Sequence, residues 1–129
     1  MAHFNSFEDL EVYQLARQLA KDVWNLIQNT SLGKDYELRN QISRSAGSVM
    51  DNIAEGFGRG GNKEFINFLG FAKGSCCETK SQFIRCFDRE HINKAEYMRL
   101  STKSQNLIDQ LGKFSNYLKK SEKRGSKFD

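Results

Sequence analysis

Residues 38–59 carry two regular stripes of side chains, one apolar and one polar. The apolar positions recur at steps of three and four, which places them on one face of an α-helix. They are Leu38, Ile42, Ala46, Val49, Ile53 and Phe57. The polar stripe lies roughly 110° further round the helix and consists of Gln41, Ser45, Ser48, Asn52, Glu55 and Arg59. Because hydroxyls and amides replace most of the Lys and Glu of a solvent face, the pattern predicts close helix contact, inside a bundle or between subunits.

The same periodicity predicts four helices joined by short breaks. The first begins near Ser6 as N-cap and runs to about residue 28, and the second runs from about Asp35 to the glycines of residues 56–61. The third covers about residues 62–88 with Asn62 as its cap, and the fourth about residues 94–120. The chain contains no proline that would interrupt them. Long helices with short connections predict an all-α fold, an up-and-down antiparallel four-helix bundle over residues 1–120.

The apolar positions also predict which helix faces turn inward. In the first helix they are Leu10, Tyr13, Ala16, Leu19 or Ala20, Val23 and Leu26 or Ile27, whereas Glu11, Arg17, Gln18, Lys21 and Asp22 are expected to face solvent. In the third helix they are Phe65, Leu69, Ala72, Cys76, Phe83 and Phe87, and in the fourth Met98, Leu107 or Ile108, Leu111, Phe114 and Leu118. A second, mostly polar stripe on the third helix consists of Phe71, Ser75, Glu78 and Gln82. Its spacing matches that of the first, so the two stripes are expected to meet.

Charge is distributed unevenly along the 129 residues, whose formal net charge is +4. Residues 1–60 hold 6 Lys and Arg against 8 Asp and Glu, whereas residues 61–129 hold 14 against 8. The second half is therefore the part that would face a nucleic acid. Residues 121–129 form a basic tail with few apolar side chains, which we expect to be disordered.

No run of about eighteen apolar residues and no signal-peptide pattern is present, so we expect a soluble, cytoplasmic protein that does not contact a membrane. The three cysteines, Cys76, Cys77 and Cys86, form an odd set on one predicted helix. Adjacent helix positions point about 100° apart and do not bridge easily. We therefore expect reduced thiols that serve as small buried side chains.

Most kinds of chemical site are disfavoured. The glycine-rich residues 56–61 lack the preceding strand and the Gly-Lys-Ser or Gly-Lys-Thr of a nucleotide loop, so an interhelical turn is preferred. The minority alternative is a phosphate held by Arg59 and the first N–H groups of the third helix. The cysteines, His3 and His91 lack zinc-ligand spacing, and no Glu-x-x-His motif supports a di-iron site. With both histidines expected outside the helices, no serine or cysteine has an evident base. We expect no enzyme activity and no catalytic, cofactor-binding or metal-binding residues.

Two sets of candidate residues remain. The first set is interpreted as packing or assembly determinants and comprises Gln41, Ser48, Asn52, Glu55, Gly56, Gly74, Ser75 and Glu78. Mutual hydrogen bonding within the bundle is the favoured role of its polar members, and a binding surface is the alternative. The second set contains candidate nucleic-acid-binding cations: Arg44, Arg59, Lys63, Lys73, Lys80, Arg85 and Arg89. Scattered cations usually only solvate a surface, but an oligomer would multiply them into a continuous band.

Three motifs carry a family resemblance. They are Phe7-x-x-Leu10, then Gln41-Ile42-x-Arg44-Ser45-Ala46-x-Ser48-Val49-x-x-Asn52-Ile53-Ala54-Glu55-Gly56, then Phe65-x-x-Phe68-Leu69-x-x-Ala72-x-Gly74-Ser75-x-x-Glu78. Over nearly its whole length, the chain resembles the four-helix bundle proteins associated with intervening sequences in large-subunit ribosomal RNA genes. The resemblance implies a homo-oligomeric, commonly pentameric barrel of bundles without known catalysis. The chain is also similar to the accessory subunit of diversity-generating retroelements, whose basic barrel binds a reverse transcriptase and nucleic acid.

The resemblance carries over six residues as helix-packing and assembly determinants: Asn52, Glu55, Gly56, Gly74, Ser75 and Glu78. Ser43 departs from the pattern because the family often has a second basic residue beside Arg44, and Cys76-Cys77 replaces aliphatic residues. The leading hypothesis is a non-enzymatic, ring-forming scaffold that binds RNA, another nucleic acid or a nucleic-acid enzyme. The alternatives are a protein-interaction adaptor and, more remotely, an enzyme with an unrecognised site.

Overall fold

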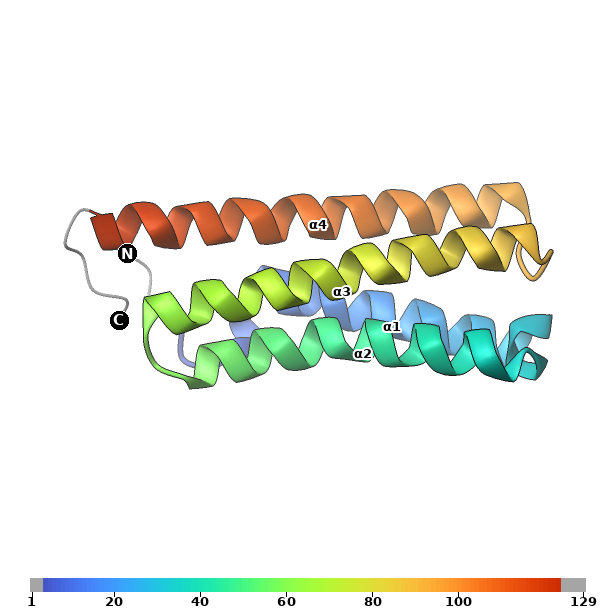
Figure 1. The fold of residues 1–129 in the computed structure, drawn as a ribbon, viewed down its shortest axis with the longest axis horizontal. Helices are drawn as coiled ribbons and strands as arrows, with labels where there is room; N and C mark the ends of the chain where they lie inside the picture. Colours follow the sequence, from blue (N-terminus) through green and yellow to red (C-terminus); the bar gives the residue numbers. More distant parts are fainter. Residues whose placement is uncertain (1–3, 124–129) are drawn as a thin grey trace.

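The computed structural model describes residues 4–123, which fold into an antiparallel bundle of four long helices (Figure 1). They are α1 (Glu11–Asn29), α2 (Tyr36–Gly58), α3 (Asn62–Asp88) and α4 (Lys94–Lys123). Two short 3-10 helices, η1 (Phe7–Asp9) and η2 (Ser31–Lys34), precede α1 and α2. No strand occurs within the described residues. The predicted all-α, up-and-down four-helix bundle is therefore confirmed.

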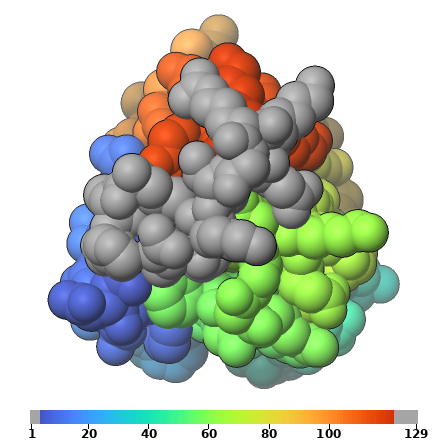
Figure 2. Space-filling model, turned by 90° about the vertical axis from the view of Figure 1, so that its left-hand side faces the viewer, coloured from blue at the N-terminus to red at the C-terminus, as the bar shows by residue number. Residues whose placement is uncertain are grey.

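The helices are arranged in chain order around the bundle. The most extensive seams join α2 to α3 and α3 to α4, and α1 packs along α2. The fourth seam, between α1 and α4, has the sparsest packing. Figure 2 looks along the bundle, with the last turns of α4 near the top, the first described residues (blue) at the lower left and the α2–α3 turn (green) at the lower right. The α2–α3 seam and the α1–α4 seam consequently lie on opposite sides of the molecule.

The core is built from the predicted apolar stripes. On α2, Leu38, Ile42, Ala46, Val49 and Ile53 are buried and Phe57 packs partly buried against them. The core positions predicted on the first and third helices are also largely confirmed, including Ala16, Leu19, Val23, Phe65, Leu69, Ala72, Cys76 and Phe83. Burial of these faces accounts for the bundle, because helical amphipathicity is stabilised chiefly by tertiary packing.

Two helix starts differ from the prediction. Ser6 makes no side-chain capping bond and precedes η1, while Leu10 is extended and 1% exposed and stands as the residue before α1. The extended, buried Leu10 thus lies between η1 and α1, so the predicted single helix start becomes a short 3-10 turn followed by the α-helix. At α3, Gly61 is the N-cap and Asn62 is the first helical residue. Asn62 instead donates from Nδ2 to the Leu118 carbonyl at 3.1 Å, which ties the start of α3 to α4.

Two side chains were assigned to the wrong side of their helices. Met98 is 53% exposed, whereas Leu100 is buried, and the core face of α4 continues through the buried Ser104. The Ser104 hydroxyl donates to the Leu100 carbonyl at 2.8 Å, so a polar residue occupies a core position that apolar spacing misses. Asp22 was predicted to face solvent but is only 6% exposed. Its carboxylate lies 3.0 Å from the Lys103 ammonium, so α4 supplies the charge that makes this burial tolerable.

The ends of α2 and α4 can be compared with the predicted breaks. Helix α2 ends at Gly58, and Gly60 has φ +85, a left-handed conformation that favours glycine, so the predicted turn in residues 56–61 is confirmed. Helix α4 continues to Lys123, beyond the predicted end at residue 120. The rest of the predicted tail, residues 124–129, lies outside the described residues, as does His3.

The cysteines do not share one environment. Cys76 and Cys86 lie in the core, where burial raises their pKa to about 12 and about 11. Cys77 is exposed, so the expectation of small buried residues is wrong for this thiol. All three are free thiols. No helix among residues 4–123 combines the length and apolar character needed to cross a bilayer.

Candidate assembly face and nucleic-acid interface

A row of hydrogen bonds joins the polar stripes of α2 and α3. The Ser45 hydroxyl donates to Gln82 Oε1 at 2.6 Å and lies 2.8 Å from the Thr79 hydroxyl. All three side chains are buried. Further along, Ser48 lies 2.9 Å from Ser75, hydroxyl to hydroxyl. The predicted meeting of the two stripes is confirmed, and the described contacts lie within one bundle.

The outer members of these stripes lie closer to solvent. The half-buried Asn52 donates from Nδ2 to the hydroxyl of Ser48 at 2.9 Å and to its carbonyl at 2.8 Å, and Arg85 donates to Gln41 Oε1. Glu55 is exposed and pairs with Arg59 at 2.8 Å. Glu78 and Gly74 are also exposed. The expectation that Glu78 belongs to a buried polar pair is therefore wrong.

Because Asn52 is half-buried and Glu78 is exposed, substitution by leucine is expected to change the free energy of unfolding at the first position and not at the second. Asn52→Leu should lower the free energy of unfolding by about 1–2 kcal/mol, because Ser48 loses its hydrogen-bond donor in a half-buried site. Glu78→Leu should leave it within about 0.5 kcal/mol of the wild type, because exposed positions contribute little. Urea denaturation of each variant measures both effects. An equal loss in the two proteins would contradict this assignment of burial.

An aromatic cluster stands at the outer edge of the α2–α3 seam. Gly56 is buried against α3, and a Cβ atom there would lie 2.5 Å from Phe68 Cβ. Phe68 is half-buried, receives the Arg59 guanidinium 4.9 Å above its ring, and contacts Phe71 edge to face at 5.5 Å. Phe71 itself is 52% exposed. This cluster is an apolar surface that the bundle leaves uncovered.

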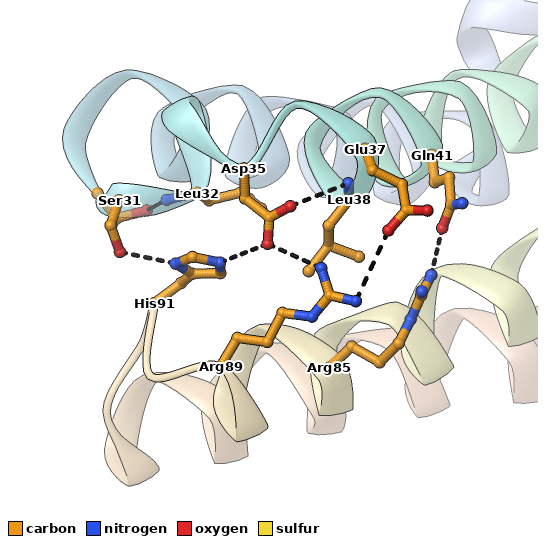
Figure 3. A network of polar contacts seen from close by, with 10 residues as sticks. Ser31, Leu32, Asp35, Glu37, Leu38, Gln41, Arg85, Arg89 and His91 are labelled. Atoms are coloured by element: carbon orange, nitrogen blue, oxygen red, sulfur yellow. Dashed lines mark hydrogen bonds and ion pairs between the residues drawn. The ribbon is translucent and has the colours of Figure 1, made fainter.

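A polar network closes the opposite end of the bundle (Figure 3). Asp35 caps α2 by accepting the Leu38 N–H at Oδ1, and its Oδ2 accepts from Arg89 at 2.9 Å and from His91 Nε2 at 2.8 Å. His91 Nδ1 lies 2.7 Å from the Ser31 hydroxyl. The α1–α2 connection, the start of α2 and the α3–α4 turn are thereby joined by side chains that Figure 3 shows converging on one carboxylate.

The network corrects the expectation that no serine lies near a base. Ser31, His91 and Asp35 are bonded in the serine–imidazole–carboxylate order that hydrolytic triads use. Asp35, however, also caps α2 and pairs with Arg89, so its charge is already engaged in holding the segments together. Contacts with His91 and then Arg89 lower the pKa of Asp35 from 3.8 to about 2. We interpret the network as a structural latch.

The latch predicts a pH-dependent stability difference. At neutral pH, Asp35→Asn should lower the free energy of unfolding by about 1–2 kcal/mol, because asparagine retains the N-cap acceptor but loses the charge. Since folding depresses the pKa of Asp35, its contribution is present above about pH 4 and is lost as the pH falls toward 2. Urea titration of both proteins across this range measures the difference. A difference that stayed constant down to about pH 2 would contradict the prediction.

The candidate cations fall into paired and unpaired groups. Arg59 and Arg89 pair with Glu55 and Asp35, and Arg85 donates to Gln41. Within residues 4–123, the candidates that form no ion pair are Arg44, Lys63, Lys73, Lys80 and Arg85. Lys80 donates to Gln105 of α4 at 2.6 Å, and the Lys73 ammonium lies beside Gly112 of α4. The seam between α3 and α4 therefore carries two lysines, Lys73 and Lys80, that form no ion pair with a carboxylate of residues 4–123.

The model of the 23S rRNA-intervening sequence protein family matches residues 8–113. The chain belongs to this family. A crystal structure from Bacteroides thetaiotaomicron VPI-5482, described as a protein with unknown function from the S23 ribosomal protein family, has the same fold. It is similar with a TM-score of 0.73 and 24% identity, covering 81% of this chain and 97% of that one. No curated protein compared with the chain matches it.

For this intervening-sequence protein, the resemblance residues divide into two environments. Asn52, Gly56 and Ser75 pack between α2 and α3, whereas Glu55, Gly74 and Glu78 are exposed. Sequence reasoning missed Phe68 as the partner of Gly56. It also missed the pairs Asp22–Lys103 and Ser31–His91, although Asp22 follows Leu19 by three and precedes Leu26 by four, which is core spacing.

Proposed function

We propose that the protein is a non-enzymatic, oligomeric helical-bundle scaffold that binds RNA or another nucleic acid through distributed basic surfaces. The observation that carries the proposal is a set of α3 lysines, Lys63, Lys73 and Lys80, that form no ion pair with a carboxylate in the described part of the chain. Lys63 and Lys73 are exposed, and both Lys73 and Lys80 reach toward α4. Membership of a family named for an rRNA intervening sequence supports the same partner class. The resemblance favours five copies, which would repeat this set of lysines around a ring.

Phosphate contacts are the available source of affinity. Lysine ammonium groups are point charges that neutralise phosphates without reading bases, so little sequence preference is expected. Such binding releases counterions and weakens steeply with salt. Fluorescence anisotropy with a generic structured RNA, at about 50 mM and about 200 mM salt, tests the proposal. Affinity should fall by orders of magnitude between the two conditions, and absence of binding at the lower salt would overturn nucleic-acid binding.

A protein-interaction adaptor that binds no nucleic acid is the second candidate. The exposed Phe71 ring favours it, because contiguous apolar surface marks sites of protein contact. Failure to bind RNA at low salt, together with a stable oligomer, would select this alternative.

A further inference from the structure

The start of α2 carries an aromatic ring that lies outside the core. Tyr36, the first residue of the helix, is 63% exposed, more than any other large apolar or aromatic side chain among residues 4–123. The Arg39 guanidinium lies over one face of this ring, with its central carbon 4.8 Å from the ring centroid. The other face and the ring edge are therefore open to solvent. Tyr36 and Arg39 are here called the Tyr36 platform.

Arg39 is held over the ring by two acceptors. One Nη atom donates to the Gly33 carbonyl at 3.2 Å, and Nε donates to Asn40 Oδ1 at 3.3 Å. Gly33 packs closely against α1, since a Cβ atom there would overlap the Ile27 carbonyl. The carbonyl that holds Arg39 is consequently anchored to a second helix. A platform whose arginine is already ordered loses little conformational entropy when a ligand stacks on it.

The carboxylates beside the platform are engaged on another side of the helix. Asp35 and Glu37 flank Tyr36 in the sequence, and Figure 3 shows both turned toward Arg89 of α3. Asp35 pairs with Arg89 at 2.9 Å and Glu37 at 3.7 Å. Both acidic neighbours of the ring therefore have a cationic partner on α3, and the platform keeps its positive charge.

The platform opens a strip along α2 that carries a second arginine. Tyr36, Asn40 and Arg44 follow one another at steps of four residues, and all three are exposed. Arg39 and Arg44 form no ion pair within residues 4–123. The next acidic residue along the helix is Asp51, seven positions beyond Arg44. The strip thus combines an open aromatic ring with two arginines that have no carboxylate partner.

This combination fits an unpaired RNA base and its phosphates. Bases stack on aromatic rings and on guanidinium planes, and arginine also binds phosphate as a forked donor. Bases inside a duplex stay stacked on their neighbours, so a ring outside the duplex reaches only those of loops, bulges and single strands. A protein partner could also bury a tyrosine and an arginine, but arginines without carboxylate partners favour a polyanion.

We propose that Tyr36 and Arg39 form a stacking site for an unpaired RNA base, with Arg44 contacting a neighbouring phosphate. The inference rests on the nucleic-acid binding of the proposed function and goes beyond it, because it assigns base contact to a surface outside the α3–α4 seam. The α3 lysines neutralise phosphates of paired and unpaired RNA alike. The platform adds a preference for unpaired segments and little preference among bases, since every base has a face that can stack.

Two RNA probes test the stacking site at low salt. One is a short single-stranded oligouridine with a central 2-aminopurine, a base analogue whose fluorescence falls when it stacks on an aromatic ring. The other is a duplex of the same length, followed by fluorescence anisotropy. Wild-type protein should bind both probes and quench the 2-aminopurine of the single strand. Tyr36→Leu should bind the single strand about 10-fold more weakly, lose the quenching and bind the duplex with unchanged affinity.

Three further variants separate stacking from other effects. Tyr36→Phe keeps the ring and should behave as the wild type. Phe71→Leu removes an aromatic ring of similar exposure from α3 and should also behave as the wild type. Arg39→Lys keeps the charge but removes the planar guanidinium, so it should weaken only single-strand binding. Circular dichroism checks that each variant retains its helices, and Arg39→Lys carries the test if Tyr36→Leu does not fold.

The outcomes distinguish the site from the proposed function. Wild-type protein that binds neither probe at low salt would overturn nucleic-acid binding itself, and the stacking site with it. Binding of both probes that Tyr36→Leu leaves unchanged, or weakens equally, would overturn only the stacking site. Single-strand binding by the wild type without any quenching of 2-aminopurine would also overturn it, and the ring would then be assigned to contact with a protein.

Discussion

Replacing Lys63, Lys73 and Lys80 together with glutamine is expected to weaken RNA binding by on the order of 100-fold or more at low salt. These three α3 lysines have no carboxylate partner among residues 4–123, so their charges remain available to phosphates. Each phosphate contact contributes close to one unit to the slope of log affinity against log salt concentration, so the slope should become shallower as well. Single replacements should have small effects because the contacts are distributed.

A matched control comes from the less basic half of the chain. Arg17, Lys21 and Lys34 are exposed, and their joint replacement by glutamine removes the same charge. Anisotropy titrations at several salt concentrations should show nearly wild-type binding for this control. Equal weakening of both triple variants would mean that net charge alone governs binding, and the α3–α4 seam would lose its assigned role.

Gly56→Val is expected to produce the largest loss of stability among single substitutions, at about 3 kcal/mol or more. A Cβ atom there would lie 2.5 Å from Phe68 Cβ and 3.1 Å from the Phe65 ring. Because Phe68 Cβ is attached to the α3 backbone, relief requires the helices to move apart. The gain in helix propensity over glycine, below about 1 kcal/mol, does not offset this overlap.

The control for Gly56 lies on the same helix. Gly47 has open space where a Cβ atom would stand, so Gly47→Ala should stabilise the protein by about 0.5–1 kcal/mol. Urea denaturation at one fixed protein concentration compares the two, because assembly would make stability depend on concentration. A Gly56→Val protein as stable as the wild type would show that α2 and α3 do not approach as closely as described.

The periodicity of apolar residues was sufficient to predict the helices and most of the core, because a 3.6-residue repeat identifies the buried face of a helix without knowledge of what packs against it. It gave wrong predictions where a residue distant in the sequence determines whether a side chain is buried. Asp22 is buried because Lys103, from another helix, pairs with it. Ser104 occupies a core position because its hydroxyl donates to the Leu100 carbonyl. Apolar spacing does not recognise a serine there, and Met98 was consequently predicted to face inward.

In the candidate site, too, some contacts could be predicted from residue spacing and others could not. Equal spacing of the two polar stripes was enough to predict that the stripes would meet, as they do where Ser48 contacts Ser75. Spacing along one helix could not reveal that His91 joins Ser31, since the two residues come from separate connections. Spacing is enough to pair Arg59 with Glu55, which stands four residues earlier. It could not pair Arg89 with Asp35, because that contact joins the end of α3 to the start of α2 and depends on the tertiary structure.

Native mass spectrometry of the chain mixed with a short structured RNA at low ionic strength tests the central claim most directly. One spectrum reports both the number of copies and the presence of RNA. A scaffold that binds nucleic acid predicts ions containing several copies of the 14.8 kDa chain together with RNA, and loss of the RNA as salt is raised. Ions of single copies without RNA would contradict both assembly and nucleic-acid binding.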